Sequence, residues 1–428
     1  MKKPVWFVLI VLVVSGCVAS HPRNERPVAW VPDWLPPART NGPTLCQRAY
    51  LKPAQGKMFL DEVTAHFPGR ASWDAYAKHL RLRIQEGAGL SPWPKRTPLN
   101  VIIRNPRLHD GYIVENIAIE SIPGYFLTGN IYRPLHAKPS FPVVLATHGH
   151  ELDQMTRFSA DTQYRCATLA RMGAVVLAVD MFGYGDSIQE LGAGAHAHPF
   201  SLTMQAWDNM RALDYLLSLP GADHDRVAVT GESGGATQSL ILTALDSRVK
   251  LAVPVVMVSS YYFGGCPCEN GMPIHRSADH FADNAMIAAL AAPRPMLLVS
   301  DGSDWTQNTP EVEFPFLRKI YSYYRADTNV ANVHLPDEKH DYGPSKRQAM
   351  YRFIGGRFHM DLAAVKGADE KIDESNVTIE PASVLSVFDA RFPVPARTLR
   401  SAVAVEHVFH LLQPTAGQPP SEKAASPK

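Results

Sequence analysis

Residues 227–236 read VAVTGESGGA: a short apolar run passes through Gly-Glu-Ser-Gly-Gly into a helix-forming segment. A chain that turns so sharply from strand to helix holds the central residue, Ser233, in a strained conformation with its hydroxyl exposed. Glycines are needed on both sides, because a β-carbon there would collide with neighbouring backbone. The new helix also points amide groups at developing negative charge. The stretch predicts Ser233 as a nucleophile; the alternative is a glycine-rich turn with an incidental serine.

The alternation of strand and helix continues on both sides of this turn. Six short apolar runs are typical of strands buried on both faces of a parallel sheet. These runs are 143–147, 174–179, 226–230, 251–256, 296–300 and 330–335. Helices are expected at 160–172, 202–218, 236–245, 314–324 and 345–353. The pattern predicts an α/β fold with a doubly wound, mostly parallel sheet that binds ligands at the carboxyl ends of its strands.

Segments outside this core predict two extensions. Residues 73–84 carry apolar side chains at three- and four-residue spacing, which predicts a helix with Ser72 as its N-cap. Residues 112–133 alternate like paired strands around a turn at Pro123-Gly124. Near the other end, residues 377–412 are expected to add a strand or two.

The N-terminus predicts export. Lys2 and Lys3 precede an apolar run at 5–14, which is too short to span a hydrocarbon core of about 30 Å but suits a signal peptide. The run leads into Val-Ser-Gly-Cys, which resembles a bacterial lipoprotein signal with Cys17 as the lipidated residue; an ordinary secretory signal with a chance cysteine is the alternative. Val18 follows the cysteine at the position where an inner-membrane retention signal has aspartate, so attachment to the outer membrane is favoured. We therefore expect an exported lipoprotein of the periplasm, outer membrane or cell surface.

Composition and length limit the class of protein and the kinds of partner that it can have. The 428 residues are 46% hydrophobic and 19% charged, as in an ordinary globular enzyme. Forty-two Lys and Arg balance 41 Asp and Glu, so no broad electrostatic field indicates a nucleic-acid partner. The expected segments are a signal peptide (1–16), a tether (17–56), a catalytic domain (57–360) beginning with an N-terminal extension and the first strands (57–135), a C-terminal extension (361–412) and a disordered tail (413–428).

Four cysteines remain once Cys17 is lipidated. They are Cys46, Cys166, Cys266 and Cys268. An oxidising compartment permits up to two disulfides in three connectivities. Zinc is the alternative at Cys266-x-Cys268, but that spacing is tighter than usual and the sequence offers no matching second pair. We expect disulfides or buried thiols, and no metal or organic cofactor.

A serine nucleophile needs a base, and the base needs an orienting acid. In enzymes with this strand–serine–helix turn, the acid and then the histidine follow along the chain. The strand at 296–300 runs into Asp301-Gly-Ser-Asp304, and Asp304, past the turn glycine, is the expected acid, whereas Asp301 is expected to fix the turn. His340 follows the last strand on a loop before a helix and is the expected base; the alternative is a surface histidine among charged neighbours.

Two backbone amides should stabilise the oxyanion of the tetrahedral intermediate. One is expected from Gly234, directly after the nucleophile. The other is expected from His150, in the loop after the strand at 143–147. A metal pair of His148 and His150 with Asp153 is the alternative interpretation of that loop.

Several segments between 73 and 358 resemble the bacterial acetyl xylan esterase-like branch of the α/β-hydrolases, which is related to dienelactone hydrolase and more distantly to prolyl oligopeptidases. They read ESIPG (120–124), HGH (148–150), DMFGYGDS (180–187), GESGG (231–235), GGCPCEN (264–270), APRP (292–295) and GSDWT (302–306). The resemblance implies that Asp304, before Trp305, is the acid and that His340 is the base. It further implies a serine esterase that removes an acyl group, expected to be O-acetyl, from a polysaccharide.

The loop from 261 to 284 should overhang the site. Its polar and aromatic side chains suit sugar contact, and the expected substrate-binding residues are Tyr261, Glu269 and Asn270 together with Trp305; a structured cap pinned by a disulfide is the alternative. Competing functions are a glucuronoyl (methyl) esterase, a prolyl-oligopeptidase-like peptidase and a surface carbohydrate-binding protein without activity. The peptidase is disfavoured because about 140 residues precede the first central strand, too few for the β-propeller such enzymes carry.

Overall fold

A computed structural model describes residues 28–35, 51–136, 138–150, 156–269 and 272–414. Predictions for Cys17, Cys46, Asp153 and Asn270, and for all but the first two residues of the 413–428 tail, lie outside these ranges. No helix among the described residues is long and apolar enough to cross a membrane.

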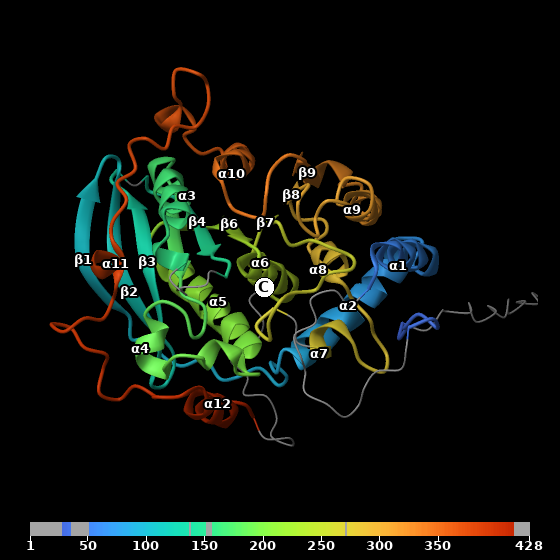
Figure 1. Ribbon diagram of the computed structural model, residues 1–428, viewed down its shortest axis with the longest axis horizontal. Helices are drawn as coiled ribbons and strands as arrows, with labels where there is room; N and C mark the ends of the chain where they lie inside the picture. Colours follow the sequence, from blue (N-terminus) through green and yellow to red (C-terminus); the bar gives the residue numbers. More distant parts are fainter. Residues whose placement is uncertain (1–27, 36–50, 137, 151–155, 270–271, 415–428) are drawn as a thin grey trace, which may run out of the picture.

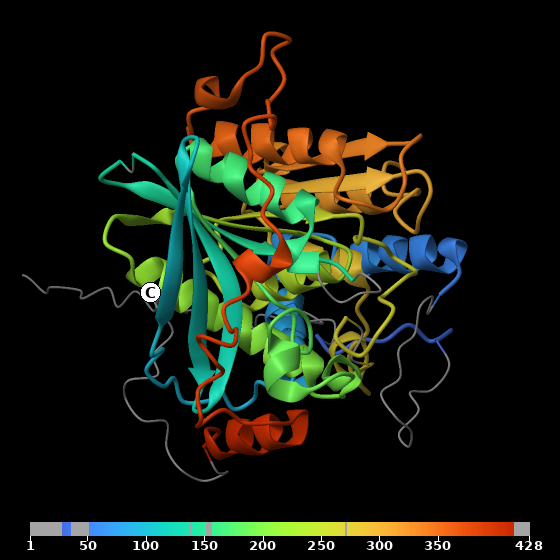
Figure 2. The same ribbon diagram turned by 60° about the vertical axis from the view of Figure 1, so that its left-hand side comes forward.

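One mixed sheet organises the described chain, in the order β1-β2-β3-β5-β4-β6-β7-β8-β9 (Figures 1 and 2). Neighbouring strands from β1 to β5 pair antiparallel, and those from β5 to β9 in this order pair parallel. The strands are β1 (Ile102–His109), β2 (Tyr112–Ile122), β3 (Tyr125–Pro134), β4 (Phe141–Thr147), β5 (Val175–Val179), β6 (Ala222–Glu232), β7 (Leu251–Val255), β8 (Met296–Asp301) and β9 (Val330–Leu335). The predicted doubly wound, mostly parallel sheet is confirmed, including the hairpin of β2 and β3; β1 was not predicted.

Helices cover both faces of the sheet and enclose two large hydrophobic cores, and a third, small cluster contains Phe126 and Phe388. One core packs α3 (Ala160–Arg171) and α10 (Pro344–Arg357) against the sheet. The other holds α5 (Ser201–Ser218), α6 (Gly234–Leu245), α8 (Asn284–Ala289) and α9 (Glu313–Ser322). The central strands β4, β5, β7 and β8 and residues 227–231 of β6 are buried on both faces. Their uniform apolarity follows from this double burial.

The N-terminal extension contains one helix that was not predicted, and the predicted helix starts three residues earlier than expected. α1 (Pro53–His66) buries Phe59 and Val63 in the core, so the boundary expected at 56 falls inside a helix. α2 (Arg70–Gly87) has Gly69 as its N-cap, and the prediction of Ser72 as the cap was wrong. Ser72 lies in the first turn, where its hydroxyl donates back to the Gly69 carbonyl at 2.9 Å.

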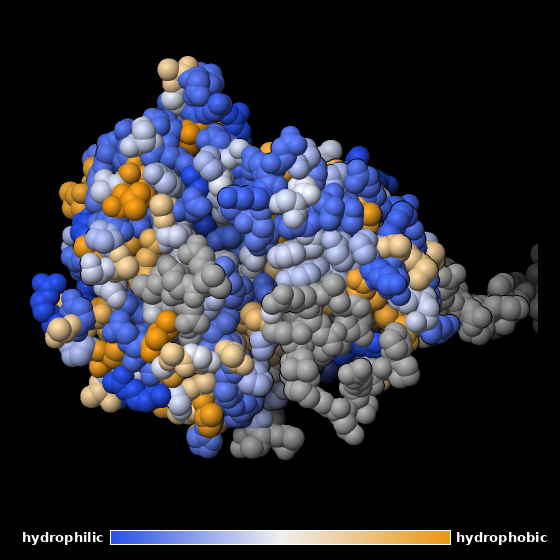
Figure 3. Space-filling model, viewed as in Figure 1, coloured by the Kyte–Doolittle hydropathy of each residue, from blue (hydrophilic) through white to orange (hydrophobic). Residues whose placement is uncertain are grey.

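The C-terminal extension carries helices where strands were expected. Between 377 and 412 the described chain forms α11 (Ala382–Leu385) and α12 (Ala402–Leu411) and contributes nothing to the sheet, so the strand prediction was wrong. The physical reason is that its apolar residues insert singly into existing surfaces. Phe388 packs on Phe126 of β3, while Phe409 of α12 packs among the side chains of α5. Figure 3 shows hydrophobic residues scattered among hydrophilic ones on the viewed face, as is usual for a folded protein surface.

Candidate active site

Ser233 occupies the sharp turn between β6 and α6. Its backbone has φ 53° and ψ −122°, a left-handed conformation that non-glycine residues rarely adopt. The turn is crowded, since a Cβ at Gly231 would collide with the Thr147 side chain. The Ser233 amide donates to the Val255 carbonyl at 3.0 Å, and its carbonyl accepts from Thr237 at 3.1 Å. Strand pairing and helix initiation together hold the serine in this strained position.

His340 meets Asp304 at the ends of the last two strands. The His340 Nδ1 atom lies 2.6 Å from Asp304 Oδ2, and the other carboxylate oxygen accepts from both the amide and the hydroxyl of Thr306, each at 2.6 Å. The Asp304 side chain is 4% exposed and that of His340 33%. Thr306 thus holds the carboxylate in place independently of the histidine ring that the carboxylate orients. Asp301 instead accepts from the Ser303 amide at 3.1 Å and lies 3.3 Å from Lys346 Nζ, which places it at the turn.

Lys346, a residue that the sequence did not indicate, ties the His340 loop to the sheet. Its side chain is fully buried on α10. The ammonium donates to the Lys339 carbonyl and lies 2.9 Å from Asp341 and 3.3 Å from Asp301. These contacts bracket His340 on both sides. These contacts place Lys346 to hold the loop that carries the imidazole.

A stacked pair of aromatic rings adjoins His340. Trp305 stacks on Tyr262 with ring centroids 3.8 Å apart, and it lies 4.6 Å from the His340 ring. The Trp305 indole nitrogen is buried and has no hydrogen-bond partner in the described part of the chain. Tyr261 is half-buried, and burial raises the pKa of its hydroxyl. Of the predicted substrate-binding residues, Trp305 directly follows Asp304 and lies beside His340, and both Trp305 and Tyr261 are partly accessible.

Ser233, Asp304 and His340 all follow the carboxyl ends of strands in the parallel part of the sheet, so they share one edge. Among the described residues no hydrogen bond joins the Ser233 hydroxyl to His340. Such bonds are often loose before substrate binds.

The loop after β4 is fastened to the nucleophile turn by Glu232. One Glu232 oxygen accepts from the Gly149 amide at 3.0 Å, and the other lies 3.1 Å from the buried guanidinium of Arg165. The loop passes so close that a Cβ at Gly234 would collide with the His150 imidazole. The sequence predicted Gly234 and His150 as amide donors. It did not indicate that Glu232 holds their two segments together. Their roles at the oxyanion stay predictions.

Comparison with known proteins identifies relatives of this chain. The sequence matches the X-Pro dipeptidyl-peptidase (S15) family over residues 124–334. The structure resembles the methylesterase BT1017, with 38% identity, a TM-score of 0.78 and coverage of 85% of this chain and 81% of that one. A glucuronoyl esterase from Teredinibacter turnerae shares the fold, with a TM-score of 0.51, 14% identity and coverage of 68% of this chain and 86% of its own. YtaP of Bacillus subtilis, whose name describes it as a hydrolase, is 25% identical over 242 residues, or 49% of this chain and 75% of its own.

The chain belongs to the α/β-hydrolase superfamily. Its methylesterase relative is 38% identical, and the match covers 85% of this chain and 81% of that one. The resemblance inferred from short motifs is therefore confirmed at the level of the superfamily.

The loop between β7 and α8 lies beside the site of this hydrolase mainly as a structural cap. His275 and His280 are buried, and their ring nitrogens lie 2.8 and 3.2 Å from the carbonyls of Ala282 and Ile274. Burial lowers the pKa of each imidazole to about 4, so both are neutral at pH 7. These rings hold the loop together and leave little for sugar contact.

Glu269, predicted to bind substrate, is buried inside the same loop. It accepts from the Gly265 amide at 2.6 Å, and burial raises its pKa to about 7, opposed by the Gly265 amide and by the charge of His340. Its other oxygen lies 3.7 Å from His150 Nδ1. Glu269 therefore faces His150 rather than an open surface.

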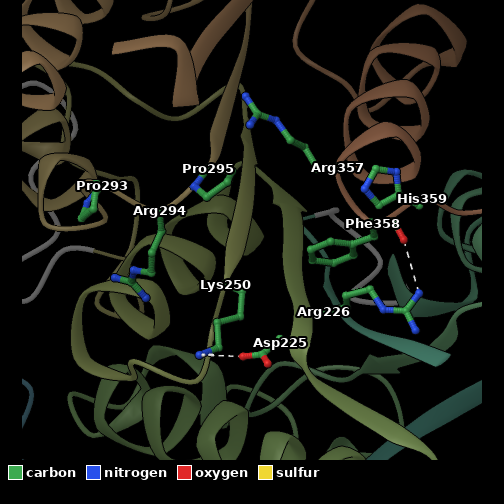
Figure 4. A pocket seen from close by; sticks show the side chains of 9 residues that line it. All are labelled: Asp225, Arg226, Lys250, Pro293, Arg294, Pro295, Arg357, Phe358 and His359. Atoms are coloured by element: carbon green, nitrogen blue, oxygen red, sulfur yellow. Dashed lines mark hydrogen bonds and ion pairs between the residues drawn. The ribbon is translucent and has the colours of Figure 1, made fainter. Parts of the chain in front are cut away.

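A pocket of about 550 Å³ lies at the opposite edge of the hydrolase, at the amino ends of β6, β7 and β8 (Figure 4). Its cations are already engaged: Lys250 pairs with Asp225 at 3.7 Å, and Arg226 donates to the Phe358 carbonyl at 3.3 Å. Because it is at the far end of these strands from Ser233, it has no part in the chemistry of the triad candidates.

Proposed function

We propose that this hydrolase is a serine esterase that acts on a carbohydrate ester. The observation that carries the proposal is the 2.6 Å contact of His340 with a fixed Asp304, on the same sheet edge as the strained Ser233. The 38% identity with a methylesterase supports ester chemistry. An inactive binding protein would have no need of this arrangement.

The proposed reaction proceeds through an acyl-enzyme. Ser233 Oγ attacks the ester carbon while His340 Nε2 takes its proton, and the amides of Gly234 and His150 stabilise the oxyanion. The imidazolium, held by Asp304, then returns the proton to the departing alcohol. Water attacks the acyl-enzyme with the same imidazole as base, which releases the acid and restores the serine.

We favour the methyl ester of a uronic acid as substrate, because the relative of 38% identity is a methylesterase. In that case the sugar carboxyl becomes the acyl group on Ser233, and methanol leaves. An O-acetyl ester is the second candidate, supported by the motifs shared with acetyl xylan esterases. There the acetyl group stays on the serine and the sugar leaves.

Export as a lipoprotein anchored through Cys17 is part of the same proposal. The apolar run at 5–14 and the cysteine that closely follows it support this placement. A tether to an outer membrane or cell surface would bring the enzyme to polysaccharides too large to enter the cell.

Replacement of the nucleophile tests the activity. Ser233→Ala should lower turnover of p-nitrophenyl acetate about 10⁴-fold or more and abolish fluorophosphonate labelling. Ser322→Ala, an exposed serine on α9, is the matched control and should keep both. Labelling of the Ser233→Ala variant at the wild-type rate would refute the assignment.

A substrate panel tests the specificity. Methanol release from methyl-esterified uronate oligosaccharides should exceed acetate release from acetylated xylan. The reverse order would favour the acetyl esterase. An Xaa-Pro dipeptide p-nitroanilide covers the peptidase alternative that the family match over 124–334 raises, and its cleavage as the best substrate would overturn the esterase proposal.

A further inference from the structure

Four potential metal ligands from three distant segments meet beside the nucleophile turn. His150 comes from the loop after β4, His196 from a short 3-10 helix (Ala195–Ala197), and Cys266 and Cys268 from the loop after β7. One ligand atom from each lies within 4.8 Å of all the others. We call these residues the His/Cys cluster. The sequence offered no second pair for Cys266 and Cys268, because the two histidines lie 70 or more positions away.

The distances between the histidine nitrogens and their neighbours in the cluster are close to those between ligands around one ion. His150 Nε2 lies 3.0 Å from His196 Nε2, 3.0 Å from Cys268 Sγ and 3.3 Å from Cys266 Sγ, and Cys266 Sγ lies 3.7 Å from His196 Nε2. Tetrahedral zinc, with Zn–S of about 2.3 Å and Zn–N of about 2.0 Å, separates its ligand atoms by roughly 3.3–3.8 Å. The two contacts of 3.0 Å would have to lengthen by about 0.3 Å to reach that geometry, and the two sulfurs, which are bonded to each other in the structure, would have to separate after reduction.

The hydrogen bonds around the histidines leave their Nε2 atoms directed at the cluster. His196 Nδ1 lies 2.7 Å from the Phe182 carbonyl, which can only accept, so the proton is on Nδ1 and the Nε2 lone pair faces inward. Its backbone is held by Gly183, where a Cβ would collide with His196. A carbonyl or carboxylate on the outer nitrogen is the usual support of a metal-bound histidine.

Glu269 provides the corresponding support for His150. Its Oε1 atom is 3.7 Å from His150 Nδ1, is buried, and has no hydrogen bond within the described part of the chain. A metal on Nε2 would place the imidazole proton on Nδ1, directed at this carboxylate. The buried Oε1 atom is therefore placed to support His150 if this ring binds a metal through Nε2.

We propose that the His/Cys cluster, with its cysteines reduced, binds one zinc-type divalent cation. Two thiolates and two imidazoles form a soft, closed ligand set that leaves no open position, as in structural zinc sites. The ion would fix His150 over Gly234 and so hold the loop whose amide is proposed to bind the oxyanion. The inference goes beyond the esterase proposal and does not depend on Ser233.

In the structure the two cysteines are joined as a disulfide, the metal-free form. A dithiol converts it to the binding form: two electrons and two protons pass to the cysteine sulfurs, and the dithiol becomes a cyclic disulfide. Zinc binding then releases the two thiol protons. In the oxidised form, the Nε2–H group of one imidazole donates to the Nε2 atom of the other. Both Nε2 atoms then have a hydrogen-bond partner.

Metal analysis tests the site. The full chain, treated with a dithiol, loaded with Zn²⁺ and desalted, should retain about one zinc per molecule. The Cys266→Ser/Cys268→Ser double variant and His196→Ala should each retain less than about a tenth of that. Cys166→Ser, which alters a buried free cysteine outside the cluster, is the matched control and should retain zinc.

A spectroscopic measurement on the wild-type chain tests the thiolate ligands even if the variants are misfolded. Co²⁺ in place of zinc should produce thiolate-to-cobalt charge-transfer absorption in the wild-type chain, which the double cysteine variant lacks. Ser233→Ala should lose esterase activity and keep the metal, so failure of one proposal is distinguishable from failure of the other. A reduced wild-type chain that holds neither Zn²⁺ nor Co²⁺ would overturn the inference.

Discussion

Asp304 and Asp301 lie three positions apart, yet the structure gives them separate tasks. Asp304 receives the His340 ring at 2.6 Å, whereas Asp301 accepts from the Ser303 amide and pairs with Lys346. Asp304→Asn should lower kcat for p-nitrophenyl acetate about 10³- to 10⁴-fold, because an amide presents the wrong group to Nδ1 and disfavours the reactive tautomer.

Asp301→Asn is the comparison for that measurement. It should change kcat less than about tenfold and lower the free energy of unfolding, because Lys346 loses a buried partner. The opposite ranking of the two variants in kcat would make Asp301 the orienting acid.

Asp208, on α5, predicts a pH dependence of stability. Burial raises its pKa to about 8, against the opposing influence of Ser121, Tyr125 and Arg211. Between the unfolded pKa and about 8 the folded state holds a proton that the unfolded state has lost, so this group reduces stability as pH rises. Asp208→Asn should therefore gain stability relative to wild type between pH 5 and pH 9, by at least about 1 kcal/mol, the equivalent of one pKa unit.

Urea unfolding at the two pH values measures this difference. Asp225→Asn, at a carboxylate whose side chain is 94% exposed, is the matched control and should not reproduce it. An Asp208→Asn curve parallel to wild type at both pH values would contradict the assigned burial effect.

At the scale of elements, Lys346 joins α10 to β8 and to the loop that carries His340. Lys346→Met should destabilise the fold by about 2–4 kcal/mol, because it leaves Asp301 buried without its cation; the other partners, Asp341 and Glu338, are partly exposed and contribute less. It should also lower kcat more than it raises KM, since the imidazole is no longer held. Urea unfolding and steady-state kinetics provide the two measurements.

Lys57→Met removes a lysine whose ion pair with Asp61 is exposed and should leave both quantities almost unchanged. If Lys346→Met lost stability but retained wild-type kcat, Lys346 would be a structural residue without a positioning role.

Over the whole molecule, the C-terminal extension is part of the core. Phe409 of α12 is fully buried against Phe200 and Trp207, with ring centroids 5.1 and 6.0 Å apart. Phe409→Ala should lower the free energy of unfolding by about 3–5 kcal/mol through lost burial and a cavity. Leu411→Ala on the same helix, 70% exposed, should cost less than about 0.5 kcal/mol. Equal effects of the two variants in urea unfolding would show that α12 does not pack as described.

The sequence determined much of this architecture by itself. The elbow at 231–235 and the apolar runs of β4 to β9 have local signatures, because a buried parallel strand needs continuous apolarity and a strand–helix turn needs glycine. The order of serine, acid and histidine followed from these strands. The helices at 377–412 could not be predicted in this way, because a few separated apolar residues are compatible with either a strand or a helix.

Only the tertiary structure decided which distant side chains meet. Lys346 beside Asp301, Glu232 against Gly149, and His196 beside Cys266 each join segments whose separation along the chain carries no sign of contact. Such meetings depend on the packing of every strand and helix between the partners, which is a property of the whole fold. Local sequence patterns record the conformation of a segment and not its neighbours in space.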